Sequence, residues 1–339
     1  MSKIQENKIG LCYDDVLIVP RYSEVLTRSA VSLAPNFKPF NGLKIPIISA
    51  NMDTITGIKM AKKMQELGGF GIIHRNESIQ NIDKAFGNTY PKNVFVAVGS
   101  YLNNKQRIDD VMSRGYNICV DIAHGDSEHM KSTLEYIRNK DSSIFIIAGN
   151  VATPGACIAL NSWGANLVKV GVGGGSACTT RIKTGCGVPQ LTAVIDCAQT
   201  GIPIIADGGI RNSGDAAKAL AAGAKFIMIG GMLAGTDSTP NWNSEDALLG
   251  KDMEFRGMAS FKAKEATGLA MRHEEGISTK VKARPQGSTE AVIKDLVDGI
   301  KSAMSYSGAC TLDEFAKSAK FCIVTSQTQK ENQAHIHVK

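Results

Sequence analysis

Residues 202–231 read IPIIADGGIRNSGDAAKALAAGAKFIMIGG, and this stretch combines two apolar runs with an alanine-rich segment between them. Two short apolar runs, 202–206 and 226–229, have the composition of buried parallel strands. The alanine-rich segment between them is typical of a helix, with Ser213 as its expected N-cap and Gly223 at its end. A strand, a helix and a second strand form a βαβ unit. The stretch therefore predicts parallel strands that are connected by helices.

The same kind of apolar run recurs along the rest of the chain. We expect eight strands, at residues 46–50, 70–74, 94–98, 117–122, 144–148, 166–170, 202–206 and 226–229. The intervening segments leave room for one helix each and carry helix signals, such as Asn103 before 104–114 and Thr153-Pro154. Eight units in one series favour an α/β fold of the closed (β/α)8 TIM barrel type over a doubly wound sheet. We expect one barrel domain over 1–339, with residues 233–300 as an active-site lid after strand eight.

The composition excludes several classes of protein. Of 339 residues, 34 are glycine and 21% are charged, which is not the profile of a disordered or fibrous chain. The net charge is +6, yet no block of basic residues is present, so we expect phosphate groups on a small ligand rather than nucleic acid. The N-terminus lacks an apolar secretory segment and turn residues interrupt the uncharged stretch 142–168, so we expect a cytoplasmic protein without membrane spans. The cysteines form no Cys-x-x-Cys pair and are expected to be free thiols.

Two pairs of glycines mark the expected ends of strands seven and eight. Gly208-Gly209 and Gly230-Gly231 stand where such barrels usually bind phosphate, because a backbone without Cβ atoms lets N–H groups approach an anion closely. The alternative is that tight turns after strands simply use glycine. Two pairs on the two expected strands favour the phosphate site. Ser176 could donate a hydrogen bond to the same phosphate.

Reactive side chains stand at the ends of other expected strands. Cys178 follows the glycine-rich loop 171–175, which would place its thiol at the barrel mouth as a nucleophile rather than in the core. Lys169 admits a different chemistry, because an amine in the barrel interior can form a Schiff base with a carbonyl substrate; its alternative is an ion pair with a core carboxylate. Asp121 and Asp207 could accept hydrogen bonds from ribose hydroxyls, or could cap the next helices.

Several motifs, taken in order along the chain, resemble the IMP dehydrogenase and GMP reductase family. They are YDDVL at 13–17 with Pro20, SANMD at 49–53, GGGSACTTR at 173–181, VPQ at 188–190, ADGGIR at 206–211, GGMLAG at 230–235 and RGM at 256–258. The resemblance extends from about residue 10 to residue 325. It implies a TIM-barrel enzyme that acts on a purine nucleotide.

Within this family most features favour the reductase branch. The family's dehydrogenases usually carry a pair of CBS domains after strand two, whereas residues 73–76 lead here through one short helix into strand three. Dehydrogenases also use a flap with an Arg-Tyr pair that activates water, and no such pair occurs in 260–275. The segments RHEEG at 272–276 and SAMSY at 302–306 resemble the reductases. In contrast, DIAHG at 121–125 resembles the dehydrogenases.

The resemblance implies a reaction in which GMP and NADPH give IMP, ammonia and NADP. Cys178 would form a covalent thioimidate at C2 of the purine, and Thr180 and Glu275 would pass protons to the departing amine. The implied nucleotide-binding residues are Ser176, Asp207, Gly208, Gly209, Gly230, Gly231, Gly257, Met258 and Ala259, with Arg272 and Gly276 on the lid side. The implied cofactor-binding residues are Asp121, Ile122, Ala123, Ser305 and Tyr306. The carbonyls of Gly173, Gly175 and Cys178 would bind a potassium ion (K+), and family members commonly form homotetramers.

Three alternatives remain open at the level of the sequence. The nearest is an IMP dehydrogenase without CBS domains, which would convert IMP and NAD to XMP. A Schiff-base lyase that uses Lys169 would belong to a different enzyme class. A barrel that senses nucleotides without catalysis is the third.

Overall fold

The fold is a closed barrel of parallel strands, as the sequence predicts. The computed structural model describes residues 9–37, 40, 42–87, 94–265 and 273–332. Within them the barrel strands are β2 (Ile47–Ser49), β3 (Phe70–Ile73), β4 (Phe95–Val98), β5 (Asn117–Asp121), β6 (Ile146–Val151), β7 (Leu167–Val170), β8 (Ile204–Asp207) and β9 (Phe226–Ile229). Each strand pairs in parallel with the next, and β9 pairs with β2 to close the ring. All eight expected strands are confirmed.

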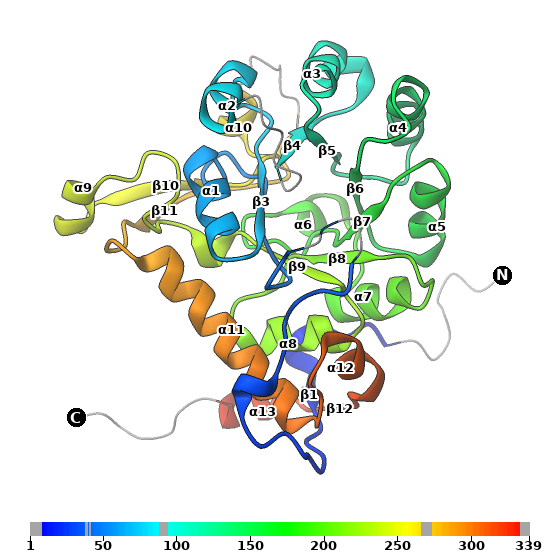
Figure 1. Ribbon diagram of the computed structural model, residues 1–339, viewed down its shortest axis with the longest axis vertical. Helices are drawn as coiled ribbons and strands as arrows, with labels where there is room; N and C mark the ends of the chain where they lie inside the picture. The colour runs from blue at the N-terminus through cyan, green and yellow to red at the C-terminus, as the bar shows by residue number, and fades with distance from the viewer. Residues whose placement is uncertain (1–8, 38–39, 41, 88–93, 266–272, 333–339) are drawn as a thin grey trace.

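A ring of helices surrounds the barrel (Figure 1). Its members are α1 (Ile58–Glu66), α2 (Ile79–Phe86), α3 (Tyr101–Ser113), α4 (Glu128–Lys140), α5 (Pro154–Ser162), α7 (Gln190–Ala198), α8 (Ser213–Ala221) and α11 (Ser288–Tyr306). Outside this ring, β1 (Val16–Ile18) pairs with β12 (Phe321–Ile323), next to α12 (Leu312–Ser318) and α13 (Thr328–Glu331). The short 3-10 turns are η1 (Tyr13–Asp15), η2 (Arg28–Ala30) and η3 (Gly231–Leu233).

Helix starts agree with the sequence in one case and differ in two. The α5 N-cap is Thr153, whose side chain accepts a hydrogen bond from Ala156 N at 3.3 Å, and Pro154 follows it as expected. The α8 N-cap is Asn212 rather than Ser213, because the Asn212 side chain reaches Asp215 N at 2.9 Å. The α3 helix begins at Tyr101, so the expected cap Asn103 lies inside its first turn.

The barrel interior changes character from one end of the strands to the other. At the N-terminal ends, Phe40, Phe70, Phe95 and Phe226 form a buried aromatic plug, in which the rings of Phe70 and Phe95 are 4.9 Å apart. Toward the C-terminal ends the inward positions become polar. On β7, for example, Leu167 belongs to the apolar interior and Lys169, two residues later, lies at the floor of a cavity. This polarity places the reactive side chains at one end of the barrel.

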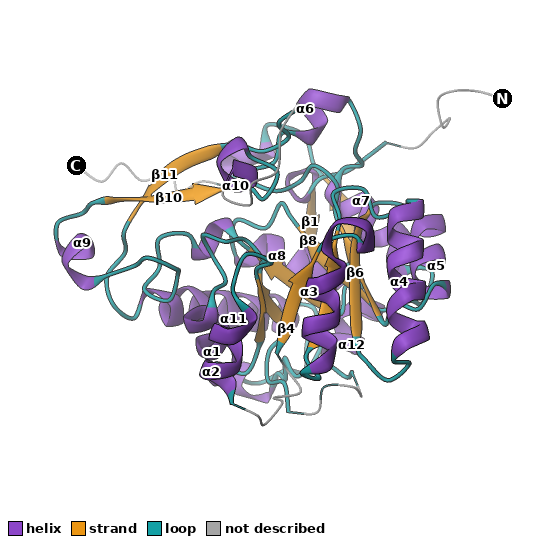
Figure 2. Ribbon diagram, turned by 90° about the horizontal axis from the view of Figure 1, so that it is seen from above, coloured by secondary structure: helices purple, strands orange, loops and turns teal. Residues whose placement is uncertain are grey.

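A hairpin covers that end of the barrel. The strands β10 (Asp252–Arg256) and β11 (Ser278–Lys282) pair antiparallel, and α10 (Phe261–Glu265) and α6 (Thr180–Thr184) lie with them beyond the strand ends (Figure 2). The α9 helix (Ser244–Leu248) lies at the outer end of the hairpin, to the side of the barrel. We call residues 252–265 and 273–282 the flap. Of the described residues within the expected lid, 233–300, the flap lies over the mouth, whereas α11 packs beside α8 on the flank of the barrel.

Two simpler expectations concern thiols and membranes. All eight cysteines are free thiols, as expected. Within the described ranges, we find no helix that combines the length and the apolar character needed to cross a bilayer.

Candidate active site

A cavity of about 530 Å³ lies at the C-terminal ends of the barrel strands, under the flap. Its size falls within the roughly 300–1,000 Å³ that small-molecule sites occupy. The expected site residues that line it are Asp121, Ile122, Ala123, Gly173, Gly175, Ser176, Cys178, Thr180, Asp207, Gly208, Gly209, Gly230, Gly231, Gly257, Met258, Ala259, Glu275 and Gly276. Residues that are scattered over 156 positions of sequence, from Asp121 to Gly276, thus meet at one place.

Three expected site residues are not part of this lining. Arg272 lies outside the described residues. Ser305 and Tyr306 end α11, and within the described chain neither side chain lines the cavity. Tyr306 is instead 60% exposed to solvent.

The loop after β7, which we call the cysteine loop (residues 171–179), positions the Cys178 thiol. Gly173 has a φ of +78°, and a Cβ atom there would collide with the Arg181 side chain, so only glycine fits. Arg181 supports the loop by donating to Val172 O at 3.2 Å and to Val188 O at 2.6 Å. The Cys178 N–H closes the turn on Gly175 O at 3.0 Å. These contacts hold the thiol at the cavity wall.

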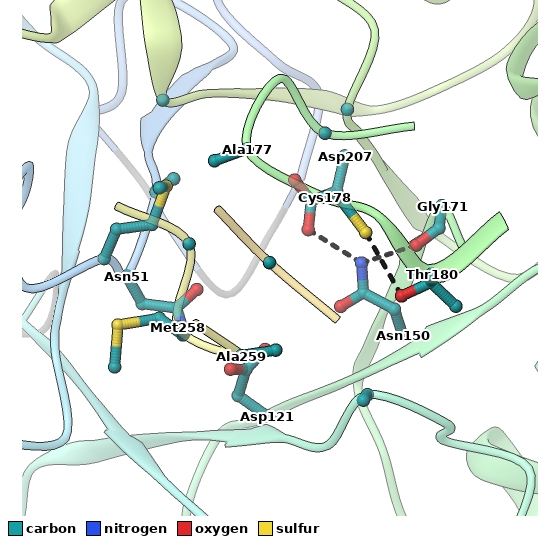
Figure 3. Close-up of a pocket in the computed structure, with 18 of the residues that line it drawn as sticks. Asn51, Asp121, Asn150, Gly171, Ala177, Cys178, Thr180, Asp207, Met258 and Ala259 are labelled. Carbon is teal, nitrogen blue, oxygen red and sulfur yellow. Dashed lines mark hydrogen bonds between the residues drawn. The ribbon is translucent and has the colours of Figure 1, made fainter. Parts of the chain in front are cut away.

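A chain of hydrogen bonds connects this thiol to a carboxylate of the flap. The Cys178 Sγ atom lies 3.2 Å from Thr180 Oγ1, as Figure 3 shows. The Thr180 hydroxyl in turn donates to Glu275 Oε2 at 2.9 Å. The three residues that the family resemblance assigns to catalysis are therefore in direct contact.

Backbone pairing between the flap and the cysteine loop fixes the position of Glu275. Thr179 N donates to Glu275 O, and Ile277 N donates to Ala177 O, both at 2.9 Å. Cys178 and Gly276 form an antiparallel bridge between these two bonds. These backbone hydrogen bonds hold the segment that carries Glu275 against the cysteine loop. The Glu275 side chain contacts Thr180 from this fixed position.

A second contact fixes the other strand of the flap. Arg256 at the end of β10 binds the Asp53 carboxylate through two nitrogens, with Nη2–Oδ2 at 2.7 Å and Nε–Oδ1 at 3.1 Å. The Asp53 side chain is only 6% exposed. Asp53 N also donates to the sulfur of Met258 at 3.3 Å. The pair therefore connects the loop after β2 with residues 257–259 of the cavity wall, a role that the sequence analysis did not assign.

The glycines of three loops bring their backbones together as a phosphate site requires. A Cβ atom on Gly231 would lie 2.7 Å from Ser176 Oγ, and one on Gly208 would lie 3.0 Å from the backbone of Gly174. Gly208 also has a φ of +106°, which disfavours any other residue. Side chains here would fill the space, so their absence leaves backbone N–H groups accessible to an anion.

Buried charges form the floor of the cavity. Lys169 is 1% exposed, and its Nζ lies 2.6 Å from Asp121 Oδ1 and 3.6 Å from Asp207 Oδ2. Burial acts to lower the pKa of Lys169, but the Asp121 and Asp207 carboxylates outweigh it and raise that pKa. Likewise, burial opposes ionisation of Asp121, yet Lys169 and Arg75 hold its pKa below the usual range. Lys169 is thus an ammonium in an ion pair, which disfavours the Schiff-base alternative because that chemistry needs a free amine.

Two cavity residues, Asn150 and Arg75, escaped the sequence analysis. Asn150 Nδ2 donates to Asp207 Oδ2 and to Gly171 O, both at 2.8 Å (Figure 3). Arg75 Nη2 lies 3.9 Å from Asp121 Oδ2. Arg75 directly follows the expected strand 70–74, and a polar residue at that place in a barrel is the signal that could have identified it. Asn150 lies two residues past the end of the expected strand 144–148.

The donor groups of the described residues bear on metal binding. No cluster of three or more His, Cys, Asp or Glu side chains occurs among them. The expected potassium ligands are backbone carbonyls, and Gly175 O already accepts the Cys178 N–H. A carbonyl oxygen has two lone pairs, so this bond leaves one for a cation. The potassium site stays a prediction.

The comparisons with known proteins agree on one family. A family model described as "IMP dehydrogenase / GMP reductase domain" matches residues 10–335. An inosine-5'-monophosphate dehydrogenase from Cryptosporidium parvum is 38% identical, over 96% of this chain and 95% of that protein. A GMP reductase from Vibrio parahaemolyticus is also 38% identical, over 95% of this chain and 96% of its own length. Among solved structures, a variant of GMP reductase from Trypanosoma brucei in complex with guanosine 5'-monophosphate has a TM-score of 0.87 and 27% identity, over 98% of this chain and 99% of that one.

Proposed function

Because this chain belongs to the IMP dehydrogenase and GMP reductase family of oxidoreductases, we propose that it is a GMP reductase, which converts GMP and NADPH to IMP, ammonia and NADP. Relatives from both branches are 38% identical, so the choice of branch depends on the chain's own residues. One observation supports the reductase branch. The flap supplies Glu275 to Thr180 at 2.9 Å, while residues 260–275 contain no Arg-Tyr pair that could activate water.

The first step is attack of the Cys178 thiolate on C2 of the purine. A ring carbon that bears an amine resists direct attack by hydride, and a covalent bond to sulfur divides the difficult reaction into two easier ones. The new C2–S bond forms as the C2–N bond breaks, and ammonia leaves. The product of this step is a thioimidate that is attached to Cys178.

Thr180 and Glu275 supply the proton that the departing amine needs. The hydrogen-bond chain from the Cys178 thiol through the Thr180 hydroxyl to Glu275 gives a path along which a proton moves without bulk water. Positioned groups of this kind contribute roughly 10²- to 10⁴-fold to a rate. The pairing of residues 275–277 with 177–179 supports this role, because it keeps Glu275 next to Thr180.

We assign the cavity wall beyond Cys178 to the nicotinamide cofactor. Bound NADPH supplies the hydride that replaces the amine at C2. Asp121 fits the cofactor because its carboxylate is kept ionised and accepts hydrogen bonds from ribose hydroxyls. Ile122 and Ala123 continue the wall next to it. When the thioimidate has been reduced, the C2–S bond breaks and Cys178 leaves as a thiolate.

The nucleotide itself would lie between the glycine loops and the flap. Gly208, Gly209, Gly230 and Gly231, with Ser176, would bind its phosphate, and Asp207 its ribose. Residues 257–259 and Gly276 would cover the base from the flap side. We also propose that the carbonyls of Gly173, Gly175 and Cys178 bind K+, because neutral backbone oxygens are the donors that this ion prefers.

We propose a homotetramer as the working form. Ser305 and Tyr306 lie at the end of α11, away from the cavity of their own chain. Their expected contact with the cofactor therefore requires that a neighbouring subunit brings this helix end to the mouth. Size-exclusion chromatography with light scattering tests the assembly.

A direct assay tests the reaction. The protein is mixed with GMP and NADPH and, separately, with IMP and NAD, and the absorbance of the reduced cofactor is followed. We expect oxidation of NADPH that depends on GMP. Reduction of NAD that depends on IMP would instead support the dehydrogenase, which the similarity to the Cryptosporidium parvum enzyme keeps as the second candidate.

A further inference from the structure

We propose that Lys169 is a positioning residue that couples the two halves of the cavity, because its single ammonium holds the carboxylate assigned to the cofactor, Asp121, and the carboxylate assigned to the nucleotide, Asp207. This inference rests on the proposed function for the identity of the two ligands. Its geometry does not depend on that assignment. Lys169 touches neither ligand in this account and acts through the two carboxylates.

The three side chains come from three different strands of the barrel. Asp121 ends β5, Asp207 ends β8, and Lys169 is the third residue of β7. The Lys169 Nζ atom lies 2.6 Å from Asp121 Oδ1 and 3.6 Å from Asp207 Oδ2. The two carboxylate oxygens are therefore separated by no more than the sum of these two distances. Two negative charges this close repel each other strongly unless a cation lies between them.

The Lys169 side chain is closely packed where it leaves the backbone. Gly149 on β6 pairs with Lys169, and a Cβ atom on Gly149 would lie 2.6 Å from the Lys169 Cβ. Cys119 fills the layer beneath, and burial raises the pKa of its thiol to about 12, so it stays a neutral packing group. The ammonium is therefore directed toward the carboxylates at the floor of the cavity.

The other polar partners divide between the two sides. Arg75 approaches Asp121 from the cofactor side at 3.9 Å, and Asn150 donates to Asp207 from the nucleotide side at 2.8 Å. Among the described residues, Lys169 is the cation that contacts both carboxylates. Loss of this lysine should therefore affect both ligands, although they bind at different walls.

Titration calorimetry with GMP and with NADPH tests the proposal without relying on turnover. In Lys169→Met, which keeps a similar side-chain length without the charge, the carboxylates must take up a proton or move apart. We expect the Kd of both ligands to rise about tenfold or more, since hydrogen bonds to charged groups contribute roughly 1.5–3 kcal/mol. Lys225→Met is the matched control, because Lys225 makes an ion pair of equal length, 2.6 Å, with Asp313 away from the cavity. It should leave both Kd values unchanged.

Two double variants separate charge balance from simple packing and remain usable if Lys169→Met does not fold. Lys169→Met/Asp121→Asn removes one charge of each sign, so Asp207 keeps Asn150 and has no close anion. We expect GMP affinity to recover and NADPH affinity to stay weak. Lys169→Met/Asp207→Asn should give the opposite pattern. A lysine that only filled space would not be rescued by either asparagine.

The outcomes distinguish this inference from the proposed function. Wild-type protein that binds neither GMP nor NADPH would overturn the proposed function and the coupling with it. Normal wild-type binding combined with unchanged affinities in Lys169→Met would overturn the coupling alone. So would double variants that both lose both ligands while their thermal unfolding stays cooperative.

Discussion

At the scale of single residues, the Thr180 hydroxyl makes the contact between the Cys178 thiol and the Glu275 carboxylate. Thr180→Val removes this hydroxyl and keeps the branched shape. We expect turnover to fall by about 10²-fold or more, since proton transfer by positioned groups contributes roughly 10²- to 10⁴-fold, and we expect GMP binding to stay unchanged. GMP-dependent oxidation of NADPH and calorimetry measure the two quantities.

The matched control for this change is Thr184→Val on the same short helix. The Thr184 hydroxyl donates to the backbone oxygen of Thr180 and is exposed. Its loss should leave turnover within about twofold, because surface changes of this kind have small effects. Equal activity in Thr180→Val and Thr184→Val would remove the hydrogen-bond chain from the mechanism.

The buried side chain of His74 should make the stability of the protein depend on pH. Burial lowers the pKa of His74 against the opposing effect of Asp53 and Glu77, and its Nδ1 accepts a hydrogen bond from Asn76 N at 3.2 Å. Because this pKa is lower in the folded chain than the value of about 6.5 in the unfolded one, the unfolded state binds the proton first as the pH falls. The stabilisation is present above about pH 6.5 and is lost as the pH falls through the folded pKa.

Urea denaturation between pH 5 and pH 8 checks this sign. The free energy of unfolding of the wild type should fall with decreasing pH in the window below about pH 6.5, with a slope of at most about 1.4 kcal/mol per pH unit from this one group. His74→Gln should lack this component. His129→Gln, at an exposed position on α4, should keep it. Parallel curves for the wild type and His74→Gln would refute the assignment.

A functional residue can be identified from the sequence where a recognisable local pattern stands next to it. Cys178 could be found because it directly follows a glycine-rich loop, and the glycine pairs because they follow apolar runs. Asn150 could not be identified in this way, because Gly149 and Asn150 favour turns and the expected strand therefore ends at residue 148. In the structure β6 continues to Val151, with a register shift between Gly149 and Val151. The contact of Asn150 with Asp207, 57 positions away, is a tertiary property.

At the scale of elements, the flap is held over the cavity by contacts at both of its strands. Arg256→Met removes the contact with Asp53 and leaves this nearly buried carboxylate without its main cation. Residues 257–259 should then lose their fixed position. We expect the KM for GMP to rise about tenfold or more, because hydrogen bonds to charged groups contribute roughly 1.5–3 kcal/mol. Steady-state kinetics with varied GMP measures the change.

Lys282→Met provides the control on the same hairpin. Lys282 pairs with Asp252 at 2.8 Å, at the end of the hairpin that lies away from the mouth. The Lys282 side chain is 72% exposed. An exposed ion pair contributes little, so the kinetic constants should stay near those of the wild type. If both variants raise the KM equally, the effect comes from the hairpin in general and not from the contact with Asp53.

The sequence predicts elements well where burial imposes a pattern and less well elsewhere. The eight barrel strands are apolar runs because both of their faces are buried. The flap strands are largely exposed and charged, as in Asp252–Arg256, so the region 233–300 could be expected only as an undivided lid. Its pairing with the cysteine loop joins residues about a hundred positions apart and depends on the completed barrel.

At the scale of the whole molecule, the barrel separates stability from chemistry along its axis. The aromatic plug lies at the N-terminal ends of the strands and the reactive side chains at the C-terminal ends. Phe95→Ala should therefore lower the free energy of unfolding by about 3–5 kcal/mol, because Phe95 is fully buried among other rings. Urea denaturation measures the loss, and GMP affinity in the folded variant should be unchanged.

The control for the plug is a large apolar residue at the surface. Leu26 is 96% exposed, so Leu26→Ala should change the free energy of unfolding by no more than about 0.5 kcal/mol. A loss of less than about 1 kcal/mol in Phe95→Ala would mean that the plug does not stabilise the barrel as argued.

In the proposed reaction, Cys178 displaces ammonia from C2 of GMP before the ring is reduced. A direct test incubates the protein with NADPH and with GMP that carries an isotope label on its 2-amino nitrogen. We expect one labelled ammonium ion and one IMP for each NADPH that is oxidised, and none of these products with Cys178→Ala. Label that stays on the purine while NADPH is consumed, or full release of ammonia by Cys178→Ala, would contradict it.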